Sequence, residues 1–133
     1  MTYHLQIVTP DGQRFDGQAE RLLVPTIHGQ MGILARHINY VTALGMGPAK
    51  VVTEEGERYA ACIGGMLAVT NGDVKVVATS FEWAEEIDVA RAQASLARAE
   101  KMLADPNGDA QTKQQAQARL KRAQVRLNVA ENR

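Results

Sequence analysis

The sequence of 133 residues is poor in cysteine and in aromatic residues, and each shortage excludes a class of protein. It holds one cysteine, Cys62, so no disulfide can form within the chain, and a cytoplasmic location fits better than secretion. Aromatic residues make up 5% and the formal net charge is zero, which argues against a nucleic-acid-binding domain. No apolar run approaches the ~20 residues that a membrane-spanning helix needs. The composition favours one globular domain with a modest appendage.

Several catalytic signatures are also missing. The sequence has no G-x-x-x-x-G-K-[ST], no H-E-x-x-H and no cysteine cluster, so we predict neither a P-loop hydrolase nor a zinc enzyme. His4, His28 and His37 are scattered with no nucleophile near them. Cys62 lies inside the apolar run YAACIGGMLAV, where a cysteine usually serves as a small buried hydrophobe. We therefore expect no catalytic residue and no metal site.

Residues 1–84 have the pattern of strands separated by turns. HLQIV alternates apolar and polar residues and is followed by the turn sequence TPDG, while Asn71-Gly72 marks a hairpin between two apolar runs. Another hairpin is predicted around Glu54-Glu55-Gly56. Short strands with regular turns predict an antiparallel β-sandwich or a β-barrel. The pair Gly64-Gly65 inside an apolar run indicates a bulge or a close approach of two backbones.

The hydrophobic period changes after about Trp83. Apolar residues then recur at spacings of three and four in two stretches of equal length: Val89, Ala92, Leu96, Ala99 and Leu103, then Ala116, Leu120, Ala123, Leu127 and Ala130. The segment DPNG at 105–108 interrupts them, so residues 85–133 are predicted to form an antiparallel two-helix hairpin and the fold class is α+β. Alanine buries little apolar area, so we expect a weakly held, releasable hairpin.

Basic residues gather near the end of this neutral chain. Residues 111–133 hold one acid, Glu131, and six basic residues: Lys113, Arg119, Lys121, Arg122, Arg126 and Arg133. A local excess of this kind predicts a surface that attracts anions, although a solvated stripe opposite an apolar seam is the common alternative.

Charged residues at the start of the first helix complete this pattern. Asp88 is a preferred helix N-cap. In an antiparallel hairpin the end of the second helix lies beside the start of the first, so Arg122 and Arg126 are expected near Asp88 and Arg91. Guanidinium groups gathered in one place repel each other unless an anion neutralises them, and their forked donors suit phosphate oxygens. The spacing thus suggests an anion site that spans both helices.

Five segments together resemble the epsilon subunit of bacterial F-type ATP synthase. They are VTPDG (8–12), GQMGILARHINYVTAL (29–44), IGGMLAVTNGDVKVVA (63–78), IDVARA (87–92) and LKRAQVRLNVAE (120–131). The resemblance covers essentially the whole chain. It implies a sandwich of about ten strands over residues 1–84, followed by the helical hairpin over residues 85–133.

The resemblance also implies a function and partners. In the family, the sandwich binds the gamma subunit and the c-ring and helps couple proton transport to ATP synthesis on the alpha/beta hexamer. The mobile hairpin permits ATP hydrolysis when folded and inhibits it when extended along gamma. We expect a non-catalytic rotor subunit that is peripheral to the cytoplasmic face of the bacterial cell membrane, has no transmembrane segment and binds no nucleic acid.

Some family members bind ATP in the folded hairpin through an I/L-D-x-x-R-A motif. Here the motif reads Ile87, Asp88, Arg91 and Ala92. By the same resemblance, further ATP contacts fall on Glu82, Arg122 and Arg126. ATP would then be a regulatory ligand that is not hydrolysed, and Mg²⁺ could bind together with it. When the ATP concentration falls, an inhibitory basic stripe of this chain would meet an acidic segment of the catalytic subunits. The stripe consists of Arg119, Lys121, Arg122 and Arg126.

Two alternatives stay open at this point. In the first, the chain is the same subunit but senses no ATP, and Asp88 is only a helix cap. In the second, which belongs to another class, a small β-barrel with a basic helix binds nucleic acid.

Overall fold

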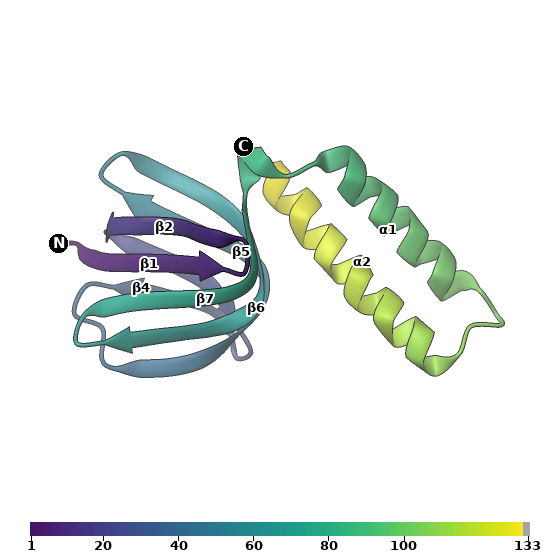
Figure 1. Ribbon diagram of the computed structural model, residues 1–133, viewed down its shortest axis with the longest axis horizontal. Coiled ribbons are helices and arrows are strands. Elements are labelled where there is room, and N and C mark those ends of the chain that lie inside the picture. Colours follow the sequence, from purple (N-terminus) through teal and green to yellow (C-terminus); the bar gives the residue numbers. More distant parts are fainter. Residues whose placement is uncertain (132–133) are drawn as a thin grey trace.

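The computed structural model describes residues 1–131. The chain consists of a β-sheet region followed by a helical hairpin (Figure 1). The strands are β1 (Tyr3–Thr9), β2 (Gly12–Ala19), β3 (Arg21–Thr26), β4 (Gly29–Leu34), β5 (Tyr40–Thr53), β6 (Gly56–Thr70) and β7 (Asp73–Trp83). A short 3-10 turn, η1 (Ala84–Glu86), leads to the helices α1 (Val89–Ala104) and α2 (Ala110–Ala130). The predicted helical domain 85–133 also includes residues 132 and 133, which lie outside the described residues.

The strands form one sheet in the order β2-β1-β7-β6-β5-β3-β4, which folds over on itself. Neighbouring strands pair antiparallel except β1 and β7, which are parallel. Both ends of the sheet contribute to one apolar core: Leu5 and Ile7 come from β1, whereas Leu22 and Ile33 come from β3 and β4. The prediction of an α+β fold with a β-sandwich and a two-helix hairpin is therefore confirmed.

The predicted number of strands, about ten, is wrong, because residues 1–131 contain seven. The physical reason is the length of β5, β6 and β7, which have 14, 15 and 11 residues. Each curves and continues as one strand (Figure 1), and the register of β5 with β6 and of β6 with β7 does not change along its length. Dividing these three strands once each would restore the expected count.

Gly64 and Gly65 lie midway along β6 and mark a close approach of two backbones. Both have positive φ, +68° and +123°. A Cβ atom on Gly65 would lie 2.1 Å from the carbonyl oxygen of Val77, which no side chain tolerates. The register of β6 with β5 and with β7 is the same before and after the pair, so no residue is inserted. Of the two predicted explanations, close approach is right and a bulge is wrong.

The hairpin packs against the sandwich through α2, while α1 lies on the outside (Figure 1). A second apolar cluster forms this contact, and its buried members are Ala61, Ile63, Ala84, Ile87, Val125, Val129 and Ala130. The residues buried between the two helices are alanines: Ala92, Ala99, Ala116 and Ala123. The leucines of the predicted seam remain partly exposed. The two helices thus contact each other through alanines, and a small apolar cluster joins them to the well-packed sandwich.

Candidate functional site

A cavity of about 500 Å³ opens at the junction of the sandwich and the hairpin. This volume lies in the range of small-molecule sites in proteins, roughly 300–1,000 Å³. Its wall contains six residues of the predicted ATP site: Glu82, Asp88, Arg91, Ala92, Arg122 and Arg126. Ile87, the first residue of the motif, does not line the cavity and is buried in the second apolar cluster. The structure therefore brings together residues from β7, α1 and α2 that are up to 44 positions apart.

Helix geometry explains why α1 and α2 present these side chains together. At the start of α1, the N-cap Asp88 and the helical residues Arg91 and Ser95 follow one another at spacings of three and four and line the cavity. On α2, Arg119, Arg122 and Arg126 do the same. Because the helices are antiparallel, the first turns of α1 face the last turns of α2 across the cavity.

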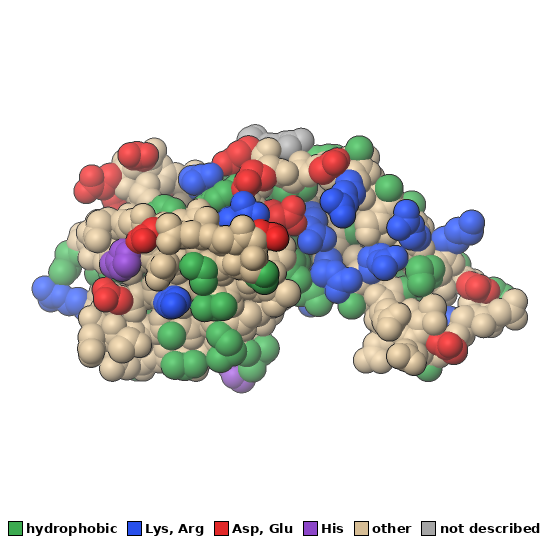
Figure 2. Space-filling view, viewed as in Figure 1, with side chains coloured by type: hydrophobic (Ala, Val, Ile, Leu, Met, Phe, Trp, Pro, Cys, Tyr) green, Lys and Arg blue, Asp and Glu red, His purple; other side chains and the backbone are tan. Residues whose placement is uncertain are grey.

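Arginines outnumber carboxylates on the cavity wall. Figure 2 shows the basic side chains gathered between the sandwich and the hairpin, with acidic side chains beside them. The charged residues that line the cavity are Arg14, Arg91, Arg119, Arg122 and Arg126 against Asp11, Glu82, Glu86 and Asp88. Among the described residues, Arg91, Arg119 and Arg122 have no ion pair. An anion in the cavity would neutralise positive charge that residues 1–131 do not pair.

Two ion pairs position the other arginines. Arg126 on α2 donates from Nε to Oε1 of Glu82 on β7, at 2.5 Å, and both side chains are about three-quarters buried. Arg14 on β2 donates from Nη1 to Oε2 of Glu86, at 3.2 Å. The first pair links the hairpin directly to the sandwich, so Glu82 orients Arg126 at the cavity.

Asp88 is the N-cap of α1, as predicted. Its Oδ1 accepts a hydrogen bond from the backbone N–H of Arg91, at 3.0 Å. This bond fixes the first turn of α1 at the cavity and leaves the carboxylate exposed. Asp88 can therefore cap the helix and still face a ligand, so the capping role and a binding role are compatible.

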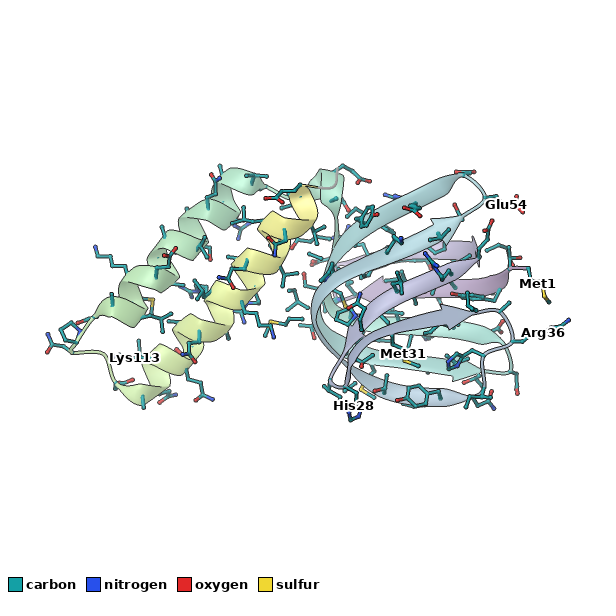
Figure 3. The ribbon with its side chains drawn as sticks, turned by 180° about the vertical axis from the view of Figure 1, so that it is seen from behind. Met1, His28, Met31, Arg36, Glu54 and Lys113 are labelled. Carbon is teal, nitrogen blue, oxygen red and sulfur yellow. The ribbon has the colours of Figure 1, made fainter. Side chains whose placement is uncertain are left out.

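The structure divides the predicted basic stripe. Arg119, Arg122 and Arg126 line the cavity, whereas Lys121 is exposed and lies outside it. Lys113 lies at the far end of the hairpin, away from the sandwich (Figure 3). Arg133 lies outside the described residues. The local positive charge noted in the sequence is thus concentrated at the cavity by the arginines alone.

Several cavity residues were not expected from the sequence. They are Asp11, Arg14, Ser80, Glu86 and Ser95, and Arg119 was assigned only to the stripe. Arg14 is 72 positions from its partner Glu86, so no local pattern connects them. Two of these residues were detectable from spacing: Ser95 follows Asp88 and Arg91 on one helical face, and Arg119 precedes Arg122 and Arg126 on another.

Other candidate groups have local structural roles. Cys62 is fully buried, and burial raises the pKa of its thiol to about 12, so it is protonated and unreactive at neutral pH. His4 pairs with Asp16, and that hydrogen bond raises the pKa of His4. Within residues 1–131, no group of three or more His, Cys, Asp and Glu side chains is placed to hold a metal ion.

Two family models match the two structural parts of the chain. The model for the ATP synthase delta/epsilon chain β-sandwich domain matches residues 2–84, and the model for the long α-helix domain of the same chain matches residues 85–131. An ATP synthase epsilon chain from Shouchella clausii is 37% identical over 131 residues, 98% of this chain and 96% of the relative. One from Caldanaerobacter subterraneus is 38% identical, over 97% of this chain and 94% of the relative.

A solved structure has the same fold. A chain in the cryo-electron microscopy structure of the Euglena gracilis mitochondrial ATP synthase has a TM-score of 0.84 and 24% identity, and the match covers 98% of this chain and 81% of that one. The sandwich and the hairpin therefore occur in this arrangement elsewhere. From these matches over both of its halves, the chain belongs to the ATP synthase delta/epsilon family, as a non-catalytic subunit of the epsilon type.

Proposed function

We propose that this chain is a rotor subunit of ATP synthase that binds ATP in the junction cavity without hydrolysing it and inhibits ATP hydrolysis when its hairpin is released. The observation that carries the proposal is a set of three arginines on the cavity wall, Arg91, Arg119 and Arg122, which form no ion pair with any residue from 1 to 131. The alternative of a nucleic-acid-binding module is set aside, because both halves of the chain match ATP synthase models.

The chemistry of the cavity fits a nucleoside triphosphate. A triphosphate carries several negative charges, and guanidinium groups bind its oxygens with hydrogen bonds of about 1.5–3 kcal/mol each. Arg91 lies on one helix and Arg122 on the other, so a bound triphosphate would bridge them. The exposed carboxylate of Asp88 adds an acceptor for a ribose hydroxyl or a base amino group, or a ligand for Mg²⁺.

Binding to the folded hairpin alone would make the hairpin respond to ATP concentration. A ligand that binds only one state stabilises it by RT ln(1 + [L]/Kd), about 2.7 kcal/mol at a hundredfold excess over Kd. The hairpin is held by one small apolar cluster and by the Arg126–Glu82 pair, so a contribution of this size is large enough to shift its release. A fall in ATP would then free the arginines of α2 to meet an acidic segment of the catalytic subunits.

The outer surface of the sandwich supports docking to partner subunits. Val77 and Met66 are opposite each other on β7 and β6, and both are 47% exposed. Val41 on β5 is 65% exposed and Ile38 just before it 76% exposed. We assign this apolar surface to contacts with the gamma subunit and the c-ring, which hold the chain peripherally at the cytoplasmic face of the membrane. None of the helices in residues 1–131 has the length and hydropathy to span a membrane.

The sensing proposal is tested by calorimetric titration with ATP, with and without Mg²⁺, and by small-angle scattering with and without ATP. The variants are Arg122→Ala and, as a matched control, Lys121→Ala, because Lys121 is the adjacent basic residue outside the cavity. We expect wild type and Lys121→Ala to bind ATP and become more compact, and Arg122→Ala to do neither. If wild type neither binds nor compacts at millimolar ATP, the arginines do not form an ATP site and Asp88 is only a cap.

The inhibition proposal needs a separate measurement. ATP hydrolysis is followed in the reconstituted catalytic complex, with the full chain or with a chain that ends at Glu86, before α1 begins. We expect the shortened chain to raise hydrolysis at low ATP, because it lacks the α2 arginines. Equal rates with both chains would contradict an inhibitory hairpin.

A further inference from the structure

We propose that Arg14 of the sandwich is a further binding residue for an anion in the cavity. The ligand would then contact the sandwich as well as both helices. This inference rests on the proposed ATP binding and extends it. Neither the sequence motif nor its spacing includes Arg14, which lies on β2.

Arg14 is held at the cavity wall from the sandwich side. Its Nη1 donates to Oε2 of Glu86 at 3.2 Å, and its side chain is 26% exposed. The other oxygen of Glu86, Oε1, accepts the backbone N–H of Trp83 at 3.2 Å. The carboxylate is therefore fixed at the start of η1, and it places the Arg14 guanidinium on the same cavity wall as Arg91 and Arg122.

The guanidinium of Arg14 has donors to spare. An arginine carries five N–H donors, and within residues 1–131 Arg14 has one acceptor, Glu86. Its Nε is buried and has no hydrogen-bond partner among the described residues. Leaving a buried donor unpaired is costly, and a small rotation of the side chain toward an anion would relieve that cost. An anion in the cavity thus gains donors that the folded protein does not use.

Arg14 and Glu86 affect a bound anion with opposite signs. Glu86 places a negative charge on the cavity wall and occupies part of the Arg14 guanidinium, so it opposes anion binding. Arg14 adds a positive charge and free donors, so it favours anion binding. If Arg14 served only to fix η1 through its ion pair, loss of either partner would harm the site in the same direction.

The test is calorimetric titration of the full chain with ATP. Wild type is compared with Arg14→Ala, Arg14→Lys, Glu86→Gln and Arg21→Ala. Glutamine at position 86 keeps an acceptor for the Trp83 N–H while it removes the charge. Arg21 is the matched control, because its Nε is also buried and has no hydrogen-bond partner in the described part of the chain, but Arg21 does not line the cavity. Circular dichroism and urea unfolding, read by fluorescence of the single Trp83, confirm that each variant is folded.

We expect Arg14→Ala to weaken ATP binding about tenfold and Arg14→Lys to weaken it less, because lysine keeps the charge but loses the fork. Glu86→Gln should tighten binding, and Arg21→Ala should leave it unchanged. The inference is overturned if Arg14→Ala binds ATP like wild type, or if Glu86→Gln weakens binding as much as Arg14→Ala does. If Arg122→Ala weakens binding while Arg14→Ala does not, the ATP site stands without Arg14. If wild type binds no ATP, both the proposed function and this inference fail.

Discussion

The sandwich and the hairpin of this chain are stabilised in different ways. The sandwich encloses large side chains such as Phe81, Leu5 and Leu67, which are 1% exposed or less. The residues buried between the two helices are alanines, and their leucine neighbours remain partly exposed. Apolar burial contributes about 25 cal/mol per Å², so the sandwich gains far more per residue than the hairpin does. The comparison identifies the sandwich as the more tightly packed region, and it supports the proposal that the hairpin is the part that can be released.

The hairpin buries little apolar surface but carries many charged side chains where it meets the sandwich. Its contact with the sandwich combines a small apolar cluster with the Arg126–Glu82 pair, and the cavity beside that pair is lined by arginines from both helices. A ligand that neutralises those arginines acts on the weakest part of the structure. A regulatory anion bound in this cavity, as proposed above, would therefore act at the contact that holds the hairpin to the sandwich.

The largest expected effect on stability comes from the same substitution, leucine to alanine, made once in each region. Leu67→Ala in the sandwich should lower the free energy of unfolding by about 2–5 kcal/mol, because Leu67 is fully buried and its loss leaves a cavity. Leu120→Ala in α2 should cost about 1 kcal/mol or less, because that side chain is only partly buried. Urea unfolding followed by Trp83 fluorescence and by circular dichroism at helical wavelengths measures both.

The two optical probes also test whether the regions unfold separately. Trp83 lies in the sandwich core, whereas the helical signal comes mainly from α1 and α2. Different midpoints for the two probes in wild type would show two cooperative units. Equal costs for the two leucine substitutions would contradict the contrast between scaffold and hairpin.

A smaller effect is expected from the contact between α2 and the sandwich. Val129 is 1% exposed in the cluster that joins them, so Val129→Ala should weaken docking by about 2 kcal/mol while the sandwich itself stays folded. Hydrogen exchange of α2, measured by mass spectrometry, should become faster, and exchange of β1 and β7 should not change. Unchanged exchange in α2 would mean that the apolar cluster does not limit release. Val77→Ala on the outer sandwich surface is the control, because Val77 lies outside that cluster.

The sequence predicted most of the features that depend on local patterns. Asn71-Gly72 forms its hairpin with positive φ at both residues, and DPNG separates the helices as expected. The facing of Arg122 and Arg126 toward Asp88 also followed from two helical periods and one short connection. These features need only neighbouring residues or the geometry of a hairpin, and both can be read from spacing.

The missed features depend on contacts between distant segments. Arg14 reaches Glu86 only because β2 pairs with β1, with a shift in register between Ile7 and Val8. No hydrophobic period in β2 predicts that shift in register, and none predicts that Arg14 of β2 lies at the cavity. The strand count failed for a similar reason, since the curvature of β5 to β7 arises from packing of the folded sheet.

The smallest expected effect concerns the start of α2, where one carboxylate holds the helix end. Oδ1 of Asp109 accepts the backbone N–H of Thr112 at 2.7 Å, and this bond lowers the pKa of Asp109 below its ordinary 3.8. Because the folded-state pKa is the lower one, the stabilisation is present above the ordinary value and is lost as the pH falls through the folded value. An NMR titration of the Thr112 amide shift should therefore show a midpoint below 3.8, and Asp109→Asn, which caps without titrating, should remove it. A midpoint at or above 3.8 would mean that the ionised carboxylate of Asp109 does not stabilise the start of α2.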